Sequence, residues 1–273
     1  MPIKAVLFDL DDTLAPETSL TRTALTQAAD AVRVQHLSPG DLAAGAQLAA
    51  RQRWQDLRVR GAPRAVATWI DNVGIGSPES LWAKFESGAP NPALAWLRAH
   101  RGVLRRVPWT EAAAALGVML TVETAARLAE QFVIARRALQ KPAEGAADVL
   151  STLRQRGLRT AIVTNGLPDL QRRKLALTGL GDLVDAVVIS GDRGLGKPHP
   201  APFDAALSRL GAPASHAVMV GDSLANDIRG AQAAGLEAVW LSTEARTEIH
   251  TQAHVGAQDY ATITALPELL HLL

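Results

Sequence analysis

The sequence predicts an α/β protein in which an all-helical domain is inserted into a doubly wound parallel sheet. Two observations lead to this prediction. Short apolar runs typical of buried strands occur near the N-terminus and again in the second half of the chain, where helical patterns separate them. The region between them, residues 16–142, is rich in Ala, Leu and Arg and shows no alternating strand pattern.

Five apolar runs are the expected strands. They lie at residues 3–9, 159–164, 185–190, 217–222 and 237–241. Nearly continuous apolar runs are needed in a sheet that helices cover on both faces. The helices of this region are expected at residues 145–156, 168–178, 200–210, 225–234 and 266–272. A glycine follows each of the first four helices, as is typical of a helix end, at Gly157, Gly179, Gly211 and Gly235.

The inserted region shows helical patterns only. Helices are expected at residues 18–35, 40–58, 63–72, 92–99, 109–116 and 121–140, separated by Pro63, Pro78, Pro90, Pro92 and Pro108. Five of the six tryptophans fall here, which favours a separate small core. We therefore expect one domain formed by residues 1–15 and 143–273, and a helical domain formed by residues 16–142.

Composition narrows the classes of function. The chain contains no cysteine, which excludes disulfides, thiolate metal sites and thiol catalysis. No apolar stretch approaches the roughly 20 residues of a membrane span, and the first apolar run is too short for a signal peptide. We expect a soluble, cytoplasmic protein without a membrane partner. A sequence pI of about 8.2, without aromatic residues interleaved in a basic stripe, also predicts no nucleic-acid partner.

Charge is distributed unevenly along the chain. Residues 16–142 hold 16 basic and 10 acidic residues, whereas the remainder has a net charge of −5. The densest basic stretch contains Arg51, Arg53, Arg58, Arg60 and Arg64. One interpretation is that this region attracts an anionic substrate; the other is that these arginines are solvated helix faces.

Four carboxylates follow two of the expected strands. Asp9 and Asp11 end the first strand, and Asp222 and Asp227 follow the fourth. Because ligands bind beyond the carboxyl ends of parallel strands, these side chains are expected to meet at one edge of the sheet. Oxygen-only ligands favour a hard cation such as Mg²⁺, which would offset the repulsion among the carboxylates. The alternative is that these aspartates are ordinary turn residues and helix caps.

Further polar groups follow two other strands. Thr164-Asn165-Gly166 closes the second strand, and Lys197 follows the third. Hydroxyl, backbone N–H and ammonium groups are suitable donors to phosphate oxygens. Taken singly, each could also be an ordinary strand-end hydroxyl or a solvated loop lysine.

Together these segments resemble the haloacid dehalogenase-like hydrolases, in their phosphatase branch. The resemblance is carried by Phe8-Asp9-Leu10-Asp11-Asp12-Thr13-Leu14, Thr164-Asn165-Gly166, Gly196-Lys197-Pro198 and Gly221-Asp222-Ser223 through Asn226-Asp227. The four segments occur in the family's order. The resemblance covers about residues 1–15 and 143–260 and does not extend in detail to the inserted region.

The resemblance implies a role for each of these residues. It implies that Asp9 is the catalytic nucleophile and a metal ligand, and that Asp11 is the general acid/base and a metal ligand through its carbonyl. Asp222 is then the third Mg²⁺ ligand, and Asp227 supports the metal site. The phosphate-binding residues implied by the resemblance are Thr164, Asn165 and Lys197. Thr13 is expected to support the turn that places Asp11.

The resemblance also implies a fold and a reaction. The core is expected to be Rossmann-like, with the insert as a helical cap of the family's first type. The implied reaction is Mg²⁺-dependent hydrolysis of a small phosphorylated metabolite through an aspartyl phosphate. Asp11 favours a phosphoryl substrate, because the family's dehalogenases lack an aspartate at that place and a halide leaving group needs no proton.

Several alternatives stay open. A phosphomutase of the same family would return the phosphoryl group to its substrate, and a non-catalytic relative would only bind a phosphorylated ligand. A phosphonate-cleaving relative would need a Schiff-base lysine in the cap, and nothing in the sequence assigns that role to Lys84. The run from Thr164 through Gln171, Lys174 and Gly179 is similar to members that act on sugar phosphates, acylneuraminate phosphates or nucleoside monophosphates.

Overall fold

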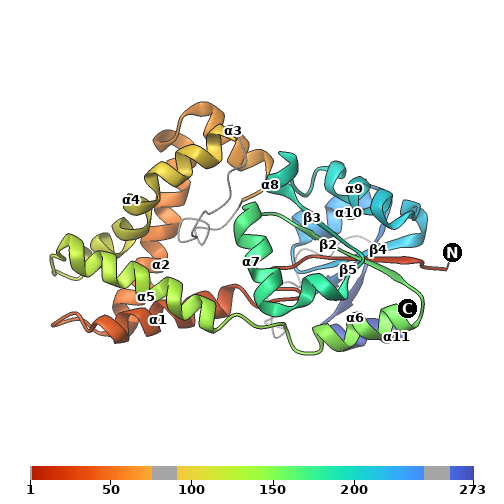
Figure 1. Cartoon of the computed structure of the whole chain (residues 1–273), viewed down its shortest axis with the longest axis horizontal. Helices are drawn as coiled ribbons and strands as arrows, with labels where there is room; N and C mark the ends of the chain where they lie inside the picture. Colours follow the sequence, from red (N-terminus) through yellow and green to blue (C-terminus); the bar gives the residue numbers. More distant parts are fainter. Residues whose placement is uncertain (1, 76–90, 243–258) are drawn as a thin grey trace. The chain divides into compact units, whose positions relative to one another are not determined.

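The chain folds into two compact units. The computed structural model describes residues 2–75, 91–242 and 259–273. Residues 1–16 and 141–273 form one unit, here called the core unit, and residues 17–140 form the other, here called the helical unit. Figure 1 shows a sheet with helices around it in the core unit and helices in the helical unit.

The core unit is built on a six-stranded parallel sheet. Its strands are β1 (Ala5–Phe8), β2 (Arg159–Thr164), β3 (Ala186–Ile189), β4 (Ala217–Gly221), β5 (Glu237–Leu241) and β6 (Ala261–Ile263). Their order in the sheet is β3-β2-β1-β4-β5-β6. The five strands expected from the sequence are confirmed. Strand β6 was not predicted, because a three-residue edge strand with one buried residue has no measurable hydrophobic pattern.

Helices cover both faces of this sheet, which confirms the doubly wound α/β fold. They are α6 (Ala146–Gln155), α7 (Pro168–Thr178), α8 (Ser190–Arg193), α9 (Pro200–Leu210), α10 (Arg229–Ala233) and α11 (Leu269–Leu272). Short 3₁₀ turns lie at residues 180–183, 214–216 and 266–268. Figure 1 shows α6 and α11 on one side of the sheet and α9 and α10 on the other.

Alternate residues of the central strand divide the core unit into two apolar layers. Val6 and Phe8 pack in the layer that contains α6, whereas Ala5 and Leu7 pack in the layer that contains Phe203 of α9. All four side chains are fully buried. Because both faces of β1 are covered, this strand is apolar throughout and its first polar residue marks its end.

Two helix predictions in the core unit need correction. The expected helix at 225–234 begins with a π-helical turn, Leu224–Ile228, and becomes α-helical only at Arg229. The wider turn carries Asp227 toward the sheet, where its side chain is buried. The short helix α8 was missed, because four residues are too few to show a helical period. The four expected stop glycines all have positive φ angles.

The helical unit contains five α-helices among its described residues. They are α1 (Thr18–Val32), α2 (Pro39–Asp56), α3 (Arg64–Asn72), α4 (Pro92–Ala115) and α5 (Val122–Ala138), with a π-helical turn at Leu57–Gly61 after α2. The separate helices expected at 92–99 and 109–116 are parts of the single helix α4. Pro78, Trp82, Lys84 and Pro90 lie outside the described residues.

Pro108 lies inside α4, although the sequence predicts a helix break at this proline. A proline removes one helical hydrogen bond and crowds the preceding turn. Here Pro108 and Trp109 are both buried, and α4 lies so close to α2 that a Cβ at Gly45 would meet the Ala112 Cβ at 3.0 Å. We infer that this close packing offsets the local cost of the proline and keeps the helix continuous.

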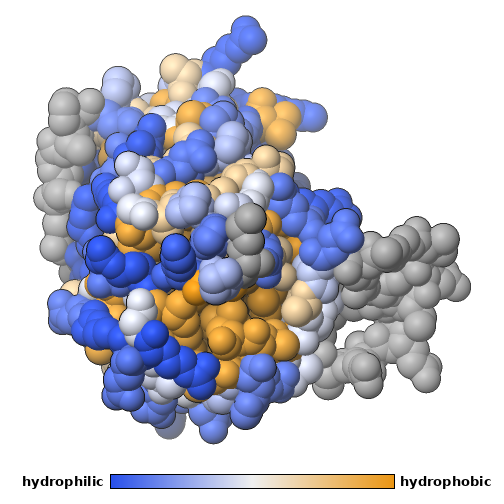
Figure 2. Space-filling view, turned by 90° about the vertical axis from the view of Figure 1, so that its right-hand side faces the viewer, coloured by the Kyte–Doolittle hydropathy of each residue, from blue (hydrophilic) through white to orange (hydrophobic). Residues whose placement is uncertain are grey.

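The surface carries both polar and apolar groups. Figure 2 shows one face on which hydrophilic residues surround an area of hydrophobic ones. Large exposed apolar side chains of the core unit include Leu177 and Leu272, which are 49% and 51% exposed. Exposed apolar residues are common on folded proteins. Among the helices in the described residues, none is both long enough and apolar enough to cross a membrane.

Candidate active site

Three carboxylates meet beyond the ends of β1 and β4. Asp9 directly follows β1, Asp222 directly follows β4, and Asp227 lies in the π-helical turn after β4. Each offers a carboxylate oxygen, and these oxygens all lie within 4.8 Å of one another. Asp9 is 8% exposed and Asp227 only 1%. The parallel pairing of β1 with β4 therefore brings together residues more than 200 positions apart in the chain.

A glycine makes the close approach of Asp227 possible. A Cβ built at Gly221 would lie 2.3 Å from the Oδ2 atom of Asp227. No side chain fits there, so the carboxylate can pack directly against the end of β4. The backbone N–H of Ser223 donates to the same Oδ2 atom at 3.0 Å, which fixes its orientation.

Lys197 joins two of these carboxylates. Its Nζ lies 2.7 Å from Asp9 Oδ1 and 2.6 Å from Asp227 Oδ1, and the residue is 3% exposed. Charge-assisted hydrogen bonds of this kind are among the strongest in proteins. A buried ammonium needs such partners, because an unpaired buried charge is very costly.

The side chain of Asn165 holds the backbone of Lys197. Its Nδ2 donates to the Lys197 carbonyl at 2.8 Å, and its Oδ1 accepts from the Lys197 N–H, also at 2.8 Å. The family resemblance implies that Asn165 binds phosphate. Its side-chain amide is instead engaged with the loop that carries Lys197, so a phosphate contact would have to come from its backbone.

Asp11 points to another group of residues. Its carboxylate does not belong to the three-carboxylate cluster described above. Lys174 Nζ lies 2.7 Å from Asp11 Oδ1, and Gln171 Nε2 donates to Asp11 Oδ2 at 2.9 Å. The same Gln171 nitrogen lies 2.6 Å from Thr164 Oγ1. One helix, α7, thus connects Asp11 with Thr164.

Gln171 and Lys174 were not among the site residues predicted from the sequence. Both are buried, at 1% and 5% exposure. A signal was present, because two long polar residues three positions apart lie on one face of a helix that directly follows Thr164-Asn165-Gly166. Their partners could not be found in this way, since Asp11 is 163 positions away from Lys174.

The turn after β1 is held by backbone hydrogen bonds. The N–H of Asp12 donates to the Ala15 carbonyl, and the N–H of Ala15 donates to the Leu10 carbonyl, both at 2.8 Å. Asp12 has a φ angle of 56°. The Thr13 hydroxyl is buried, and no hydrogen-bond partner for it is found in the described part of the chain. A supporting role of Thr13 through this hydroxyl therefore stays a prediction.

Burial and like charges perturb the carboxylates of the cluster. Burial raises the pKa of Asp9 well above its usual value; Lys197 opposes this, and Asp227 and Asp222 add to it. Burial, with the charges of Asp227 and Asp12, raises the pKa of Asp222 to about 7. For Lys197, burial alone would lower the pKa, but Asp227 and Asp9 raise it above its usual value. When its three carboxyls are ionised, the cluster carries more negative charge than the single Lys197 ammonium neutralises.

The cluster fits a small divalent cation. Mg²⁺ takes oxygen ligands at about 2.1 Å, so oxygens on opposite sides of the ion lie about 4.2 Å apart. The oxygens of Asp9, Asp222 and Asp227 lie within 4.8 Å of one another, close to this upper limit for oxygens bound to one ion. A cation would also relieve the repulsion that raises the pKa of Asp9 and Asp222.

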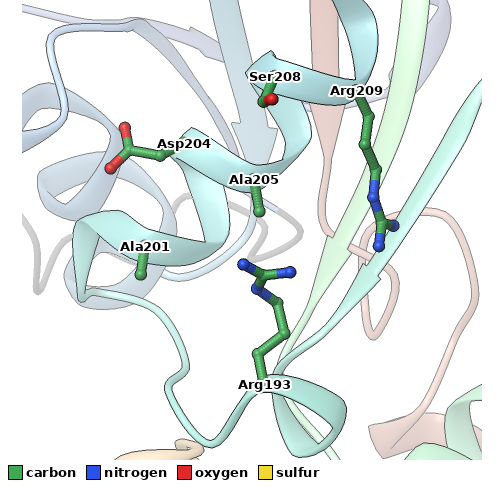
Figure 3. Close-up of a pocket in the computed structure, with 6 residues that line it drawn as sticks. All are labelled: Arg193, Ala201, Asp204, Ala205, Ser208 and Arg209. Atoms are coloured by element: carbon green, nitrogen blue, oxygen red, sulfur yellow. The ribbon is translucent and has the colours of Figure 1, made fainter.

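A surface pocket of the core unit has a different lining. It measures about 440 Å³ and is lined by Arg193, Ala201, Asp204, Ala205, Ser208 and Arg209. Figure 3 shows these side chains, which come from α8 and α9. None of the residues discussed above lines it, so the candidate active site is defined by its side chains and not by this cavity.

Comparison with known proteins places this geometry in a family. A profile of haloacid dehalogenase-like hydrolases matches residues 3–235. The chain belongs to the haloacid dehalogenase-like hydrolases. A phosphoserine phosphatase from Thermus thermophilus is 35% identical over 90% of this chain and 91% of its own length. The pyrimidine 5′-nucleotidase YjjG from Escherichia coli is 34% identical over 74% of this chain and 81% of its own length.

Solved structures support the same fold. The HAD-hydrolase YfnB from Bacillus subtilis, in a magnesium-bound crystal structure, superposes with a TM-score of 0.65. It is 21% identical and covers 100% of this chain and 99% of its own. Membership in this family, together with phosphatase relatives, identifies the chain as a hydrolase of the phosphoric monoester class.

Proposed function

We propose that this HAD-like hydrolase is a Mg²⁺-dependent phosphatase that hydrolyses a small phosphate monoester through an aspartyl phosphate on Asp9. The observation that carries the proposal is the position of the Asp9 carboxylate. It lies at the end of β1, 2.7 Å from the Lys197 ammonium and in one cluster with Asp222 and Asp227. In such a place the Lys197 ammonium orients the nucleophile and balances part of the charge of the incoming phosphate, and the neighbouring carboxylates could hold a cation that balances more of it.

In the first displacement, an Asp9 oxygen attacks phosphorus and the bond from phosphorus to the ester oxygen breaks. The leaving alkoxide is a poor leaving group unless it is protonated, so Asp11 donates a proton to it. Lys197 and Thr164 bind the phosphoryl oxygens, which carry the charge of the transition state. The products of this step are the free alcohol and phosphorylated Asp9.

In the second displacement, water attacks phosphorus. Asp11, now a carboxylate, accepts a proton from this water, the bond between phosphorus and the Asp9 oxygen breaks, and inorganic phosphate leaves. Asp9 and Asp11 are thereby ready for another turnover. The two displacements divide one very slow hydrolysis into two faster steps.

Asp9, Asp222 and the Asp11 carbonyl would hold the cation, and Asp227 would support it. The ion supplies electrostatic stabilisation of the phosphoryl oxygens when it is bound. Asp227 contacts Lys197 and Ser223 in the structure, which suits a residue that orders the site.

Phosphate release from 4-nitrophenyl phosphate tests the mechanism directly. We expect turnover with MgCl₂, loss of turnover with EDTA, and a decrease of about 10⁴-fold or more in Asp9→Asn. Asp204→Asn, which changes an exposed carboxylate of the core unit, is the control and should keep full activity. Activity that survives Asp9→Asn would contradict the covalent mechanism.

The same assay separates the competing functions. A phosphomutase would convert its substrate into an isomer without net release of phosphate, and a non-catalytic relative would bind without turnover. The substrate is expected among small phosphorylated metabolites, so a panel should include phosphoserine, pyrimidine nucleoside monophosphates and glyceraldehyde 3-phosphate, for which relatives are named.

We propose that the helical unit acts as the cap that selects among these substrates. A cytoplasmic location stays a prediction.

A further inference from the structure

We propose that Gln171 and Lys174 are positioning residues that hold the general acid/base Asp11 in a fixed arrangement with the phosphate-binding hydroxyl of Thr164. This inference rests on the function proposed above. It adds two residues of α7 to the machinery of the site and assigns each a distinct contact.

Lys174 holds one oxygen of Asp11. Its Nζ lies 2.7 Å from Asp11 Oδ1, and its side chain is 6% exposed, against 28% for the Asp11 side chain. The lysine stem is therefore packed inside the protein while the carboxylate reaches toward solvent. A buried ammonium on a helix is held more firmly than a surface lysine, so it can fix the direction of its partner.

Gln171 holds the other oxygen of Asp11 and the hydroxyl of Thr164. Its Nε2 lies 2.9 Å from Asp11 Oδ2 and 2.6 Å from Thr164 Oγ1, with a third, longer contact to the Asn165 carbonyl at 3.4 Å. An amide nitrogen only donates. The Thr164 oxygen therefore accepts from Gln171, and its own hydrogen stays available to donate to a phosphoryl oxygen.

The orientation of the Gln171 amide follows from the same contacts. If the amide were turned over, its carbonyl oxygen would face the Asp11 carboxylate and repel it. Close packing also fixes its position, because a Cβ at Gly166 would lie 2.8 Å from Gln171 Cδ. The glycine that follows Thr164 and Asn165 thus makes room for the side chain that links Thr164 to Asp11.

These contacts matter for the first displacement. The proton that Asp11 donates must reach the ester oxygen of a phosphoryl group whose position Thr164 helps to set. A single nitrogen that binds both residues couples the two positions, and an error of about 1 Å in such an arrangement can cost about 100-fold in rate. The coupling should matter most where the leaving group needs the proton.

Two substrates of similar shape separate this effect from a general loss of function. The leaving group of 4-nitrophenyl phosphate is a weakly basic phenolate that departs without a proton, whereas that of phenyl phosphate is more basic. We would measure kcat/KM for both with Gln171→Met and Lys174→Met in the presence of MgCl₂. The ratio of the two values within one preparation is independent of the fraction of folded enzyme.

We expect each variant to lower kcat/KM for phenyl phosphate about tenfold or more beyond its effect on 4-nitrophenyl phosphate. Arg172→Met is the matched control, because Arg172 lies on the same helix but pairs with the exposed Asp192. It should leave the ratio unchanged. An unchanged ratio in both Gln171→Met and Lys174→Met would overturn the inference.

Asp11→Asn shows which of the two ideas fails. If Asp11 is the general acid, this variant must lower kcat/KM for phenyl phosphate much more than kcat/KM for 4-nitrophenyl phosphate. If Asp11→Asn changes the ratio of the two kcat/KM values but Gln171→Met and Lys174→Met do not, the positioning role is wrong and the proposed mechanism stands. If Asp11→Asn leaves this ratio unchanged, the acid/base role of Asp11 is wrong, and the positioning role fails with it.

Discussion

The two units of this molecule place their charges differently. In the core unit, Lys197, Lys174 and Asp227 are almost completely buried and bonded to one another or to site carboxylates. In the helical unit, the largest buried side chains are apolar or aromatic, such as Trp54 and Trp109, and ion pairs such as Arg53 with Glu111 lie at the surface. Burying charge is costly, so it is expected where chemistry needs it. The contrast agrees with the proposal that the core unit carries the reaction, and it shows a helical unit whose interior is mainly apolar.

The largest effect that would test this contrast is expected at Lys197. Lys197→Met removes the ammonium that lies between Asp9 and Asp227 and leaves two buried carboxylates facing each other. We expect kcat/KM to fall about 10²- to 10³-fold, because a charged group that stabilises the transition state is lost. Kinetics on 4-nitrophenyl phosphate, with circular dichroism to monitor folding, measure this. A well-folded variant with native kcat/KM would contradict the assignment.

Among the described residues of the helical unit, the pair of Arg136 and Glu17 departs from this pattern because it is largely buried. Arg136 Nη2 lies 2.5 Å from Glu17 Oε2, and the two side chains are only 13% and 9% exposed. We expect Arg136→Met to lower the free energy of unfolding by about 3 kcal/mol, because it removes the cationic partner of a buried carboxylate. Urea unfolding followed by tryptophan fluorescence reports mainly on this unit, which holds five of the six tryptophans.

The exposed pair of the same unit is the control for this experiment. Arg53 and Glu111 have side chains that are 47% and 38% exposed. Arg53→Met should therefore change the free energy of unfolding by less than about 1 kcal/mol. Equal effects of the two substitutions would show that burial does not distinguish these pairs.

The stability of the core unit should depend on pH and Mg²⁺ together. The pKa of Asp222 is raised to about 7 in the folded protein, mainly by burial. A raised pKa means that the folded state binds this proton more tightly than the unfolded state does. The protonated Asp222 therefore contributes fully to stability below the pKa of the unfolded state. This contribution is lost as the pH rises through about 7. At higher pH, Mg²⁺ would neutralise the Asp222 carboxylate in place of the lost proton.

We therefore expect the increase in Tm caused by MgCl₂ to be larger at about pH 8 than at about pH 5.5, by about 3 °C. Thermal unfolding with MgCl₂ or EDTA at the two pH values measures it. Asp222→Asn should reduce this pH dependence, because one of the two carboxyls whose pKa is raised is then absent. A larger Mg²⁺ effect at the lower pH would contradict the assignment of the cation to these carboxylates.

The smallest expected effect concerns the basic stretch of the helical unit. Arg53 and Arg58 are engaged in ion pairs with Glu111 and Asp71, so they are poor candidates for attracting a substrate. Arg51 and Arg60 are exposed. The double substitution Arg51→Glu and Arg60→Glu should raise KM about two- to fivefold at low salt, with little change at high salt. An unchanged KM at low salt would favour the interpretation as solvated helix faces.

The sequence predicted the elements of the core unit well, because their signals are local. Apolar runs fix the strands, and the aspartates after the runs that became β1 and β4 were expected at one edge of the sheet, where the structure brings Asp9, Asp222 and Asp227 together. Local signals failed where tertiary packing prevails. Pro108 predicts a helix break, but it lies within the continuous helix α4, which packs against α2.

By itself, the sequence determined which polar side chains are candidates for the site and which strand each of them follows. Both can be seen from the position of a residue directly after an apolar run. Only the tertiary structure decided how those side chains are used. It directs the Asn165 amide to the Lys197 backbone, and it connects Asp11 to Lys174 and Gln171. These pairs are 32 to 163 positions apart, and the direction of a side chain depends on which atoms surround it after folding. No local pattern in the chain contains that information.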